Sequence, residues 1–217
     1  MTELTLSADA LLTGKPAFIA PGVLSAMGKT AVSGPVQITW LGLTGDSVAD
    51  PINHGGHDKA IHVFPQEHYD WWRGPIGAHP LLDQPGAFGE NIATTGAVET
   101  GLCLGDRFSL GSVLLEISHG RQPCSKLNDR FGNKKVLATA VQSGKVGYYL
   151  RVLREGEAQA GDAMTLIERP HPDWTLARLF DVLIGGGFKR DPEGVAELAQ
   201  MPVLAEAWRS RAEKFAR

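Results

Sequence analysis

Short β-rich runs separated by turn residues occupy most of this 217-residue chain. The runs lie at 36–40, 60–64, 107–110, 113–118, 148–153 and 163–167, and glycine, proline and aspartate punctuate them. Many short strands joined by tight turns favour a barrel or a sandwich over a sheet built from βαβ units. Two helices interrupt the pattern, one at 65–72 with Pro65 as its first helical residue and one at 134–143 that ends at Gly144. We therefore predict a mostly β, barrel-like domain with helices over residues 1–170.

The pattern changes after residue 170, where three segments have the apolar spacing of helices. These segments are 175–184, 192–200 and 203–216, and glycines at 185–187 and the pair Met201-Pro202 separate them. We predict that residues 171–217 form a small tail of three helices. We expect the apolar face of its first helix to dock on the barrel or on a second subunit of a homodimer, and that face is formed by Leu176, Leu179, Phe180 and Leu183.

The bulk properties of the chain exclude several classes of protein. A net charge of -3 argues against a general nucleic-acid binder, which needs a basic surface to release counterions. No apolar run approaches the roughly 20 residues that span a bilayer, so no membrane association is expected. The first residues lack the basic start and the apolar stretch of a signal peptide. We therefore expect a cytoplasmic protein whose two cysteines stay reduced.

Cys124 has the surroundings of a reactive thiol. It lies at a predicted strand-to-helix junction between Arg121 and Lys126, and both cations and a helix N-terminus favour the thiolate form. A thiolate can act as a nucleophile or bind a soft metal. Cys103, by contrast, lies in an apolar run and is predicted to be a packing residue. His119 is the histidine nearest to Cys124 in sequence, and we predict that it is a partly exposed loop residue.

Two glycine-containing loops are further candidates for a binding site. The segment HGGHDK at 54–59 could offer backbone N–H groups and basic side chains to an anion, or it could be a polar turn. A zinc site at His54 and His57 is less favoured, because no third and fourth ligands lie nearby in sequence. In the second loop, at 86–92, Glu90 could orient a cation and Asn91 could present its amide to a heterocycle. The chain has no serine-nucleophile elbow, Walker loop or Rossmann fingerprint.

Taken together and in this order, these segments resemble the MOSC domain, named after the C-terminus of molybdenum cofactor sulfurase. The match is closest to the stand-alone YiiM type, which also carries a short three-helix tail, so the resemblance covers nearly the whole chain. The segments that carry it are NHGGHDKAIHVFPQEHYDWW (53–72), GAFGENIATTG (86–96), GDRF (105–108), RQPCSKLN (121–128), GKVGYYLRVLREG (144–156) and AGDAMTLIERP (160–170).

The resemblance implies a β-barrel-like fold that holds a molybdenum–pterin cofactor, with Cys124 as the protein ligand to molybdenum and as a catalytic residue. Related members reduce N-hydroxylated compounds such as amidoximes and hydroxylaminopurines, with electrons from separate flavin or iron–sulfur proteins. A thiolate suits a soft metal, and the planar fork of Arg121 suits a phosphate. His57 or Asp58 is expected to pass protons. The expected cofactor-binding residues are His54, Gly55, Gly56, Lys59, Glu90, Asn91, Arg121 and Lys126.

Two other functions use the same residues. The chain could be a sulfur carrier or a cofactor-delivery module in which Cys124 holds a persulfide. It could also be a non-enzymatic domain whose glycine loops bind another phosphorylated ligand. Multiple-turnover reduction with an artificial electron donor separates the enzyme from the carrier, because a carrier shows none. Fold analogy favours the enzyme without proving its activity.

Overall fold

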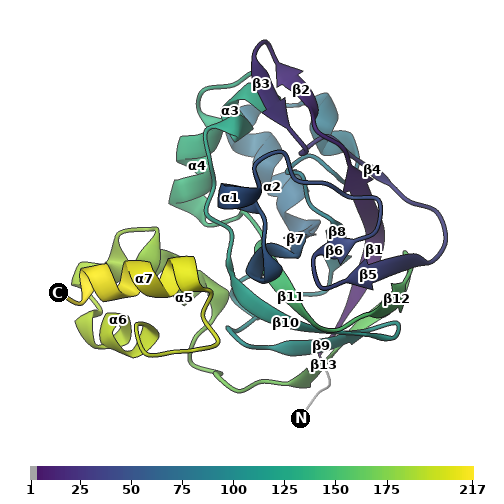
Figure 1. Ribbon diagram of the computed structural model, residues 1–217. Coiled ribbons are helices and arrows are strands. Elements are labelled where there is room, and N and C mark those ends of the chain that lie inside the picture. Colours follow the sequence, from purple (N-terminus) through teal and green to yellow (C-terminus); the bar gives the residue numbers. More distant parts are fainter. Residues whose placement is uncertain (1–3) are drawn as a thin grey trace.

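Seven strands close into a barrel in the computed structural model, which describes residues 4–217 (Figure 1). Neighbouring strands are antiparallel except for the parallel pair β7 and β8, and the last strand pairs with the first. In order around the barrel the strands are β13 (Ala163–Glu168), β9 (Arg107–Leu110), β10 (Val113–Gly120), β11 (Tyr148–Arg154), β7 (Ile61–Pro65), β8 (Ile92–Thr95) and β1 (Thr5–Gly14). The predicted mostly β, barrel-like fold with helices is confirmed.

Strand β1 closes the barrel. Its start pairs with β13, its middle with β8 and its end with the short strand β4 (Lys29–Ala31). The register shifts between Ala8 and Ala10. Such a bulge bends a strand and lets one long segment serve several neighbours. Strand β1 lies outside the runs predicted to be strands.

Smaller elements lie outside the closed sheet of the barrel. Strands β5 (Val36–Thr39), β6 (Gly42–Leu43) and β12 (Gly156–Ala158) form a separate sheet, and β2 (Ala17–Ala20) and β3 (Val23–Ser25) form a hairpin. The short helical elements here are α1 (Pro51–His54), η1 (His57–Lys59), η2 (Pro80–Asp83) and α3 (Lys126–Arg130). Figure 1 shows α1 in front of the barrel strands. These elements supply the loops that carry most of the predicted site residues.

Two longer helices interrupt the strands where the sequence predicts them, with one difference. Helix α4 (Val136–Ser143) ends at Gly144, which adopts the left-handed conformation. Helix α2 (Glu67–Ile76) begins two residues after Pro65. The prediction that Pro65 starts this helix is wrong, because Pro65 is the last residue of β7 and pairs with Thr94 of the parallel strand β8.

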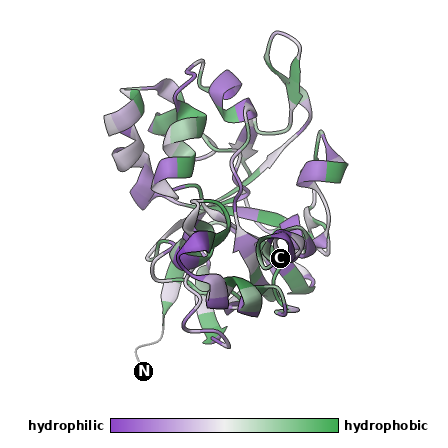
Figure 2. Ribbon diagram, turned by 90° about the vertical axis from the view of Figure 1, so that its left-hand side faces the viewer, coloured by the Kyte–Doolittle hydropathy of each residue, from purple (hydrophilic) through white to green (hydrophobic). Residues whose placement is uncertain are grey.

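The C-terminal tail consists of α5 (Leu176–Leu183), η3 (Gly187–Lys189), α6 (Pro192–Leu198) and α7 (Glu206–Phe215). Thr175 caps α5 through a hydrogen bond from the Arg178 amide, and Asp191 caps α6 in the same way. Figure 2 shows hydrophobic bands beside hydrophilic ones on these helices, as expected for helices with one buried face.

The tail docks on the barrel. The backbone N–H of Leu176 donates to Leu102 at 2.8 Å, and the N–H of Ala205 donates to Ser118 at 3.1 Å. The predicted apolar face is buried, and its residues belong to the same hydrophobic core as the barrel residues. The tail therefore extends the core of the barrel. No helix within residues 4–217 is long and apolar enough to cross a membrane.

Ion pairs between arginines and carboxylates hold the barrel wall on the side of β9 and β10. Arg107 lies 2.8 Å from Glu116 and 2.5 Å from Glu168. Arg151 lies 2.9 Å from Glu116 and 2.7 Å from Asp58. Arg169 donates two hydrogen bonds to the fully buried Asp106, at 2.8 and 2.6 Å. We call these seven residues the outer network: Asp58, Asp106, Arg107, Glu116, Arg151, Glu168 and Arg169.

Candidate functional site

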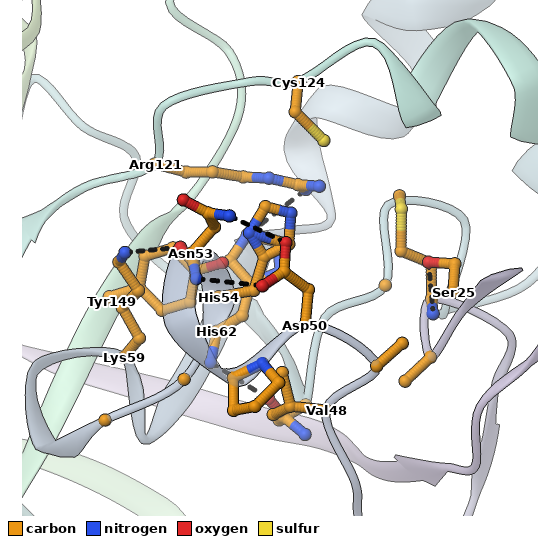
Figure 3. A pocket seen from close by; sticks show the side chains of 18 of the residues that line it. Ser25, Val48, Asp50, Asn53, His54, Lys59, His62, Arg121, Cys124 and Tyr149 are labelled. Atoms are coloured by element: carbon orange, nitrogen blue, oxygen red, sulfur yellow. Dashed lines mark hydrogen bonds between the residues drawn. The ribbon is translucent and has the colours of Figure 1, made fainter. Parts of the chain in front are cut away.

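A cavity of about 620 Å³ lies at the end of the barrel that α1, η1 and the loop before α3 surround (Figure 3). Strands β7, β10 and β11 contribute one wall, and helix α7 of the tail contributes part of another. Eight residues predicted to form the site line this cavity: His54, Gly55, Gly56, Lys59, Asn91, Arg121, Cys124 and Lys126. Segments far apart in the sequence therefore meet here.

Cys124 stands in the loop that joins the end of β10 to α3. Its side chain is half-buried. Figure 3 shows the sulfur directed toward the guanidinium of Arg121, with His54 and His62 on the other side of that group. The thiol is therefore reachable from the cavity and has a cation beside it. Cys103 is 2% exposed and donates its S–H to the Pro172 carbonyl at 3.4 Å, and burial raises the pKa of its thiol.

Arg121 is a buried cation without a carboxylate partner. Its residue is 6% exposed, and its Nη1 donates to the Phe88 carbonyl at 2.7 Å and lies 3.5 Å from Nε2 of His62. No ion pair joins it to a carboxylate among residues 4–217. A buried charge is costly unless a charge of opposite sign compensates it. The cavity is therefore arranged to receive an anion at Arg121.

Gly147 fixes the backbone at this point. The N–H of Arg121 donates to the Gly147 carbonyl at 3.0 Å. Gly147 has a φ of +79°, and a Cβ there would lie 2.2 Å from the Val63 carbonyl oxygen and 3.0 Å from Nε2 of His62. Only glycine satisfies both the conformation and the close approach. Gly147, the residue just before β11, thus sets the position from which the Arg121 side chain extends into the cavity.

The HGG segment forms one rim of the cavity. Asp50 caps α1, and Lys59 donates from Nζ to the Asn53 carbonyl at 2.7 Å. Burial lowers the pKa of both Lys59 and His54. Gly56 has a φ of +98°, and no atom lies within 4 Å of the position that a Cβ would occupy. Its backbone is therefore accessible to a ligand, as the sequence suggested for these glycines.

The second glycine loop is held in place by Glu90 and by two arginines, Arg121 and Arg130, which donate to its backbone carbonyls. Glu90 is fully buried and accepts hydrogen bonds from the Tyr69 hydroxyl and from the backbone of Gly86 and Phe88. It does not line the cavity. Asn91 does so, and its Oδ1 accepts the backbone N–H of His62 at 3.1 Å. Glu90 therefore shapes the loop, and Asn91 presents its side chain to the cavity wall.

The two predicted proton carriers lie away from the cavity lining. His57 is exposed in η1. Asp58 belongs to the outer network through Arg151, and its second oxygen accepts the N–H of Glu206 at 3.4 Å. The structure therefore brings their neighbour Lys59 to the cavity but not these two side chains.

Sequence reasoning missed an aromatic row along the cavity wall. His62 lies 5.1 Å from Tyr149, Tyr149 lies 5.1 Å from His119, and His119 lies 5.4 Å from Trp208, measured between ring centroids. All four rings line the cavity. The four residues come from β7, β11, β10 and the tail, so no local sequence motif indicates that their rings lie together.

Both histidines of this row are neutral at physiological pH. Burial, followed by the charge of Arg121, lowers the pKa of His62 well below its ordinary value. Burial and the charge of Lys59 lower the pKa of His119 to about 3. The prediction that His119 is a partly exposed loop residue is wrong, because β10 extends two residues further than expected and leaves His119 only 1% exposed. The wall is consequently aromatic and uncharged.

The cavity as a whole is cationic. Asp46 pairs with Lys29 and also accepts a hydrogen bond from Nδ2 of Asn91 at 2.7 Å. Burial lowers the pKa of Lys29. The charged lining residues are four cations and two carboxylates: Lys29, Lys59, Arg121, Lys126, Asp46 and Asp50. An anionic ligand is therefore favoured over a cationic one.

The side chains that line this cavity differ from those of a metal site built entirely from protein ligands. Within the described part of the chain no three or more histidine, cysteine, aspartate or glutamate side chains are grouped so that they could hold a metal ion. Cys124 is thus a single soft donor beside an anion-binding surface. This arrangement suits a metal that arrives with other ligands already attached.

Comparisons with known proteins agree with this fold and site. A model of the MOSC domain family matches residues 50–165. A Gibberella moniliformis protein named "Reductase" is 36% identical over 182 residues, which cover 83% of this chain. The chain spans only 32% of the length of that protein.

Two proteins named YiiM are similar over most of this chain. The Escherichia coli protein is 36% identical over 157 residues, which cover 72% of this chain and 70% of that protein. The crystal structure of YiiM from Geobacillus stearothermophilus superposes with a TM-score of 0.81 at 30% identity, covering 98% of this chain and 100% of the other. The chain therefore belongs to the MOSC domain family and is of the YiiM type.

Proposed function

We propose that this protein binds a molybdenum–pterin cofactor and reduces N-hydroxylated compounds, with Cys124 as the protein ligand to molybdenum. One observation carries the proposal: a reachable thiol and a buried arginine without a carboxylate share one cationic cavity. A relative named "Reductase" supports the reaction class. Electrons would come from a separate protein that carries flavin or an iron–sulfur centre.

The residues present fit such a cofactor. The thiolate of Cys124 is a suitable ligand for a soft metal, and the guanidinium of Arg121 can bind a phosphate through two parallel hydrogen bonds. Further contacts to the anionic part would come from the rim of the cavity, from His54, Gly55, Gly56, Lys59 and Lys126. The amide of Asn91 already bonds the His62 N–H and Asp46, so Asn91 would hold this wall of the cavity beside the heterocycle, and Glu90 would hold the loop that positions it. The bound cofactor supplies the two-electron redox chemistry.

The chain itself must supply protons. Reduction of an N-hydroxyl group to an amine takes up two electrons and two protons, breaks the N–O bond and releases one water molecule. His62 and His119 are neutral and do not serve as acids. Lys59 lines the cavity and has a pKa lowered by burial, so its Nζ is the proton donor that we propose in place of His57 and Asp58.

Metal and pterin content tests the proposal directly. Molybdenum by mass spectrometry and pterin by fluorescence would be measured on protein from a cofactor-producing host. We expect near-stoichiometric metal in the wild type and at least about a tenfold loss in Cys124→Ala. Cys103→Ala is the matched control, because it removes a thiol that does not line the cavity, and it should retain the metal.

Activity with an artificial electron donor completes the test. Multiple turnovers of a hydroxylaminopurine or an amidoxime by the wild type, and none by Cys124→Ala, are expected. Full reduction by Cys124→Ala with cofactor bound would refute the ligand assignment. Bound cofactor without turnover would favour the delivery module, and no metal or pterin in a well-folded wild type would favour the non-enzymatic domain.

A further inference from the structure

Glu99 and His68 form a buried pair outside the lining of the cavity. Glu99 belongs to the segment between β8 and β9, and His68 belongs to α2. The Glu99 oxygen Oε2 accepts a hydrogen bond from Nε2 of His68 at 2.5 Å. The pair also borders a second cavity, of about 440 Å³, which residues of α4 and α5 line as well. The proposed reaction uses neither side chain.

Glu99 holds the peptide unit that joins Val146 to Gly147. Gly147 is buried, so its N–H needs a partner within the protein, and the Glu99 oxygen Oε1 accepts it at 2.9 Å. The carbonyl oxygen of Val146 belongs to the same unit and lies 3.3 Å from Nε2 of His62. Because a peptide unit is planar and rigid, the bond to Glu99 fixes the direction of both groups.

The next group along the chain carries this constraint to Arg121. The Gly147 carbonyl accepts the backbone N–H of Arg121 at 3.0 Å. The Arg121 side chain then donates to the Phe88 carbonyl and lies 3.5 Å from Nε2 of His62. Two residues that line the cavity at the anion site, Arg121 and His62, therefore contact the segment that Glu99 holds.

The side chain of Glu99 has a single orientation, because each of its two oxygens has a partner of its own. His68 is fixed in turn, since its ring packs edge-on against Phe64 with 5.8 Å between the ring centroids. Glu99 also meets the tail, but it does so through its main chain, whose carbonyl accepts the N–H of Ala177 at 3.0 Å. A substitution of the Glu99 side chain therefore leaves that main-chain bond to the tail available.

We propose that Glu99 is a positioning residue for the anion-binding site, and that His68 holds it in orientation. The inference rests on the proposed function, in which Arg121 binds the anionic part of the cofactor. Neither side chain of the pair lines the cavity, so both act through the backbone of Gly147. Partners of this kind often decide how well a binding group is placed, although they do not touch the ligand.

Two substitutions of similar volume separate positioning from packing. Glu99→Met removes both acceptors, whereas Glu99→Gln keeps one oxygen for the Gly147 N–H and an amide that can donate to the His68 ring. Binding of inorganic phosphate to the full chain, produced in a host that makes no cofactor, would be measured by calorimetry. We expect Kd to rise at least about tenfold in Glu99→Met and less than about threefold in Glu99→Gln. An unchanged Kd in Glu99→Met, or an equal rise in both variants, would overturn the inference.

Asp106→Ala is the matched control. Asp106 is likewise a buried carboxylate that accepts a backbone N–H, that of Cys103 at 2.8 Å, and neither residue lines the cavity. This variant should lose stability and still bind phosphate with a Kd within about twofold of the wild type. A rise in Kd as large as that in Glu99→Met would show that lost stability alone weakens binding, and it would overturn the inference.

His68→Phe decides the question if Glu99→Met does not fold. It keeps a ring beside Phe64 and removes the donor to Glu99, so the carboxylate loses one of its two partners. We expect the Kd for phosphate to rise at least about threefold. A value equal to that of the wild type would refute the role of the pair.

Arg121→Met separates this inference from the proposed function. Phosphate binding that is lost in Arg121→Met establishes the anion site whether or not the protein carries molybdenum. An unchanged Kd in Glu99→Met would then refute the positioning role alone. A raised Kd in Glu99→Met, with no molybdenum or pterin in protein from a cofactor-producing host, would refute the proposed function and keep the positioning role. If the wild type binds no phosphate at Arg121, the positioning role is wrong as well.

Discussion

The outer network and the cavity treat buried charge in opposite ways. In the network every arginine meets a carboxylate, and Asp106 is fully buried because Arg169 compensates it. In the cavity Arg121 is also buried, at 6% exposed, but its side chain donates only to a backbone carbonyl and approaches a neutral histidine. Paired charges hold the fold, whereas an unpaired buried charge marks where a ligand supplies the missing partner. The two cysteines differ in a similar way, because Cys103 is buried in the fold whereas Cys124 is half-buried and lines the cavity.

The largest effect is expected where the network is broken at its most buried residue. Asp106→Ala removes the acceptor of two Arg169 hydrogen bonds and of the Cys103 N–H. We expect a loss of about 3 kcal/mol in the free energy of unfolding, measured by urea denaturation. Arg190→Ala, which breaks an exposed pair with Asp181, is the control and should cost less than about 1 kcal/mol. Similar losses in the two variants would contradict a structural role for buried pairing.

The second prediction compares the two thiols. Alkylation by iodoacetamide needs access and a thiolate. Cys124 is half-buried at the cavity, whereas Cys103 is buried with a raised pKa. We expect Cys103 to react roughly 100-fold more slowly than Cys124, as measured by mass spectrometry over time. Comparable rates would remove the distinction between a packing thiol and a site thiol.

The third prediction uses the aromatic wall of the cavity. His119 has a pKa of about 3 in the folded protein because burial disfavours its cation. As the pH falls below 6.5, the ordinary pKa of histidine, this residue is protonated in the unfolded chain but stays neutral in the folded protein. The free energy of unfolding therefore declines until about pH 3. From about pH 7.5 to about pH 5 this residue should cost about 2 kcal/mol.

The measurement is the free energy of unfolding against pH for the wild type and His119→Phe. The variant keeps a ring against Tyr149 and Trp208, and its stability should fall less steeply over this range. His57→Gln is the control at an exposed histidine and should follow the wild type. Parallel curves for wild type and His119→Phe would show that His119 is protonated in the folded state.

The sequence predicted the parts of this molecule that local patterns encode. Strand β9 alternates between buried and half-buried residues, β10 is a nearly continuous buried strand rich in β-forming residues, and turn residues separate the two. The loops with Cys124 and Asn91 contain residues whose chemistry is visible in sequence. Strand β1 was missed because its alternation includes small and polar residues and its three partners are distant in the chain.

The wall of the cavity could not be predicted for a related reason. His62 and Tyr149 are strand residues, and alternation shows which residues share a face of a strand but not which face opens on a cavity. Trp208 reaches the site only because the tail docks on β10. Tertiary contacts of this kind leave no local signal.

The smallest effect, and the sharpest test of the comparison, is expected at Arg121. Arg121→Met removes an uncompensated buried cation and keeps an unbranched side chain of similar length, at the loss of one hydrogen bond to the Phe88 carbonyl. These contributions oppose each other, so the free energy of unfolding of the ligand-free protein should stay within about 1 kcal/mol of the wild type or rise. Arg169→Met, which leaves Asp106 buried without its partner, should cost about 3 kcal/mol. If Arg121→Met destabilised the protein as strongly as Arg169→Met, Arg121 would be a structural residue, and the inference that the cavity binds an anion at Arg121 would be wrong.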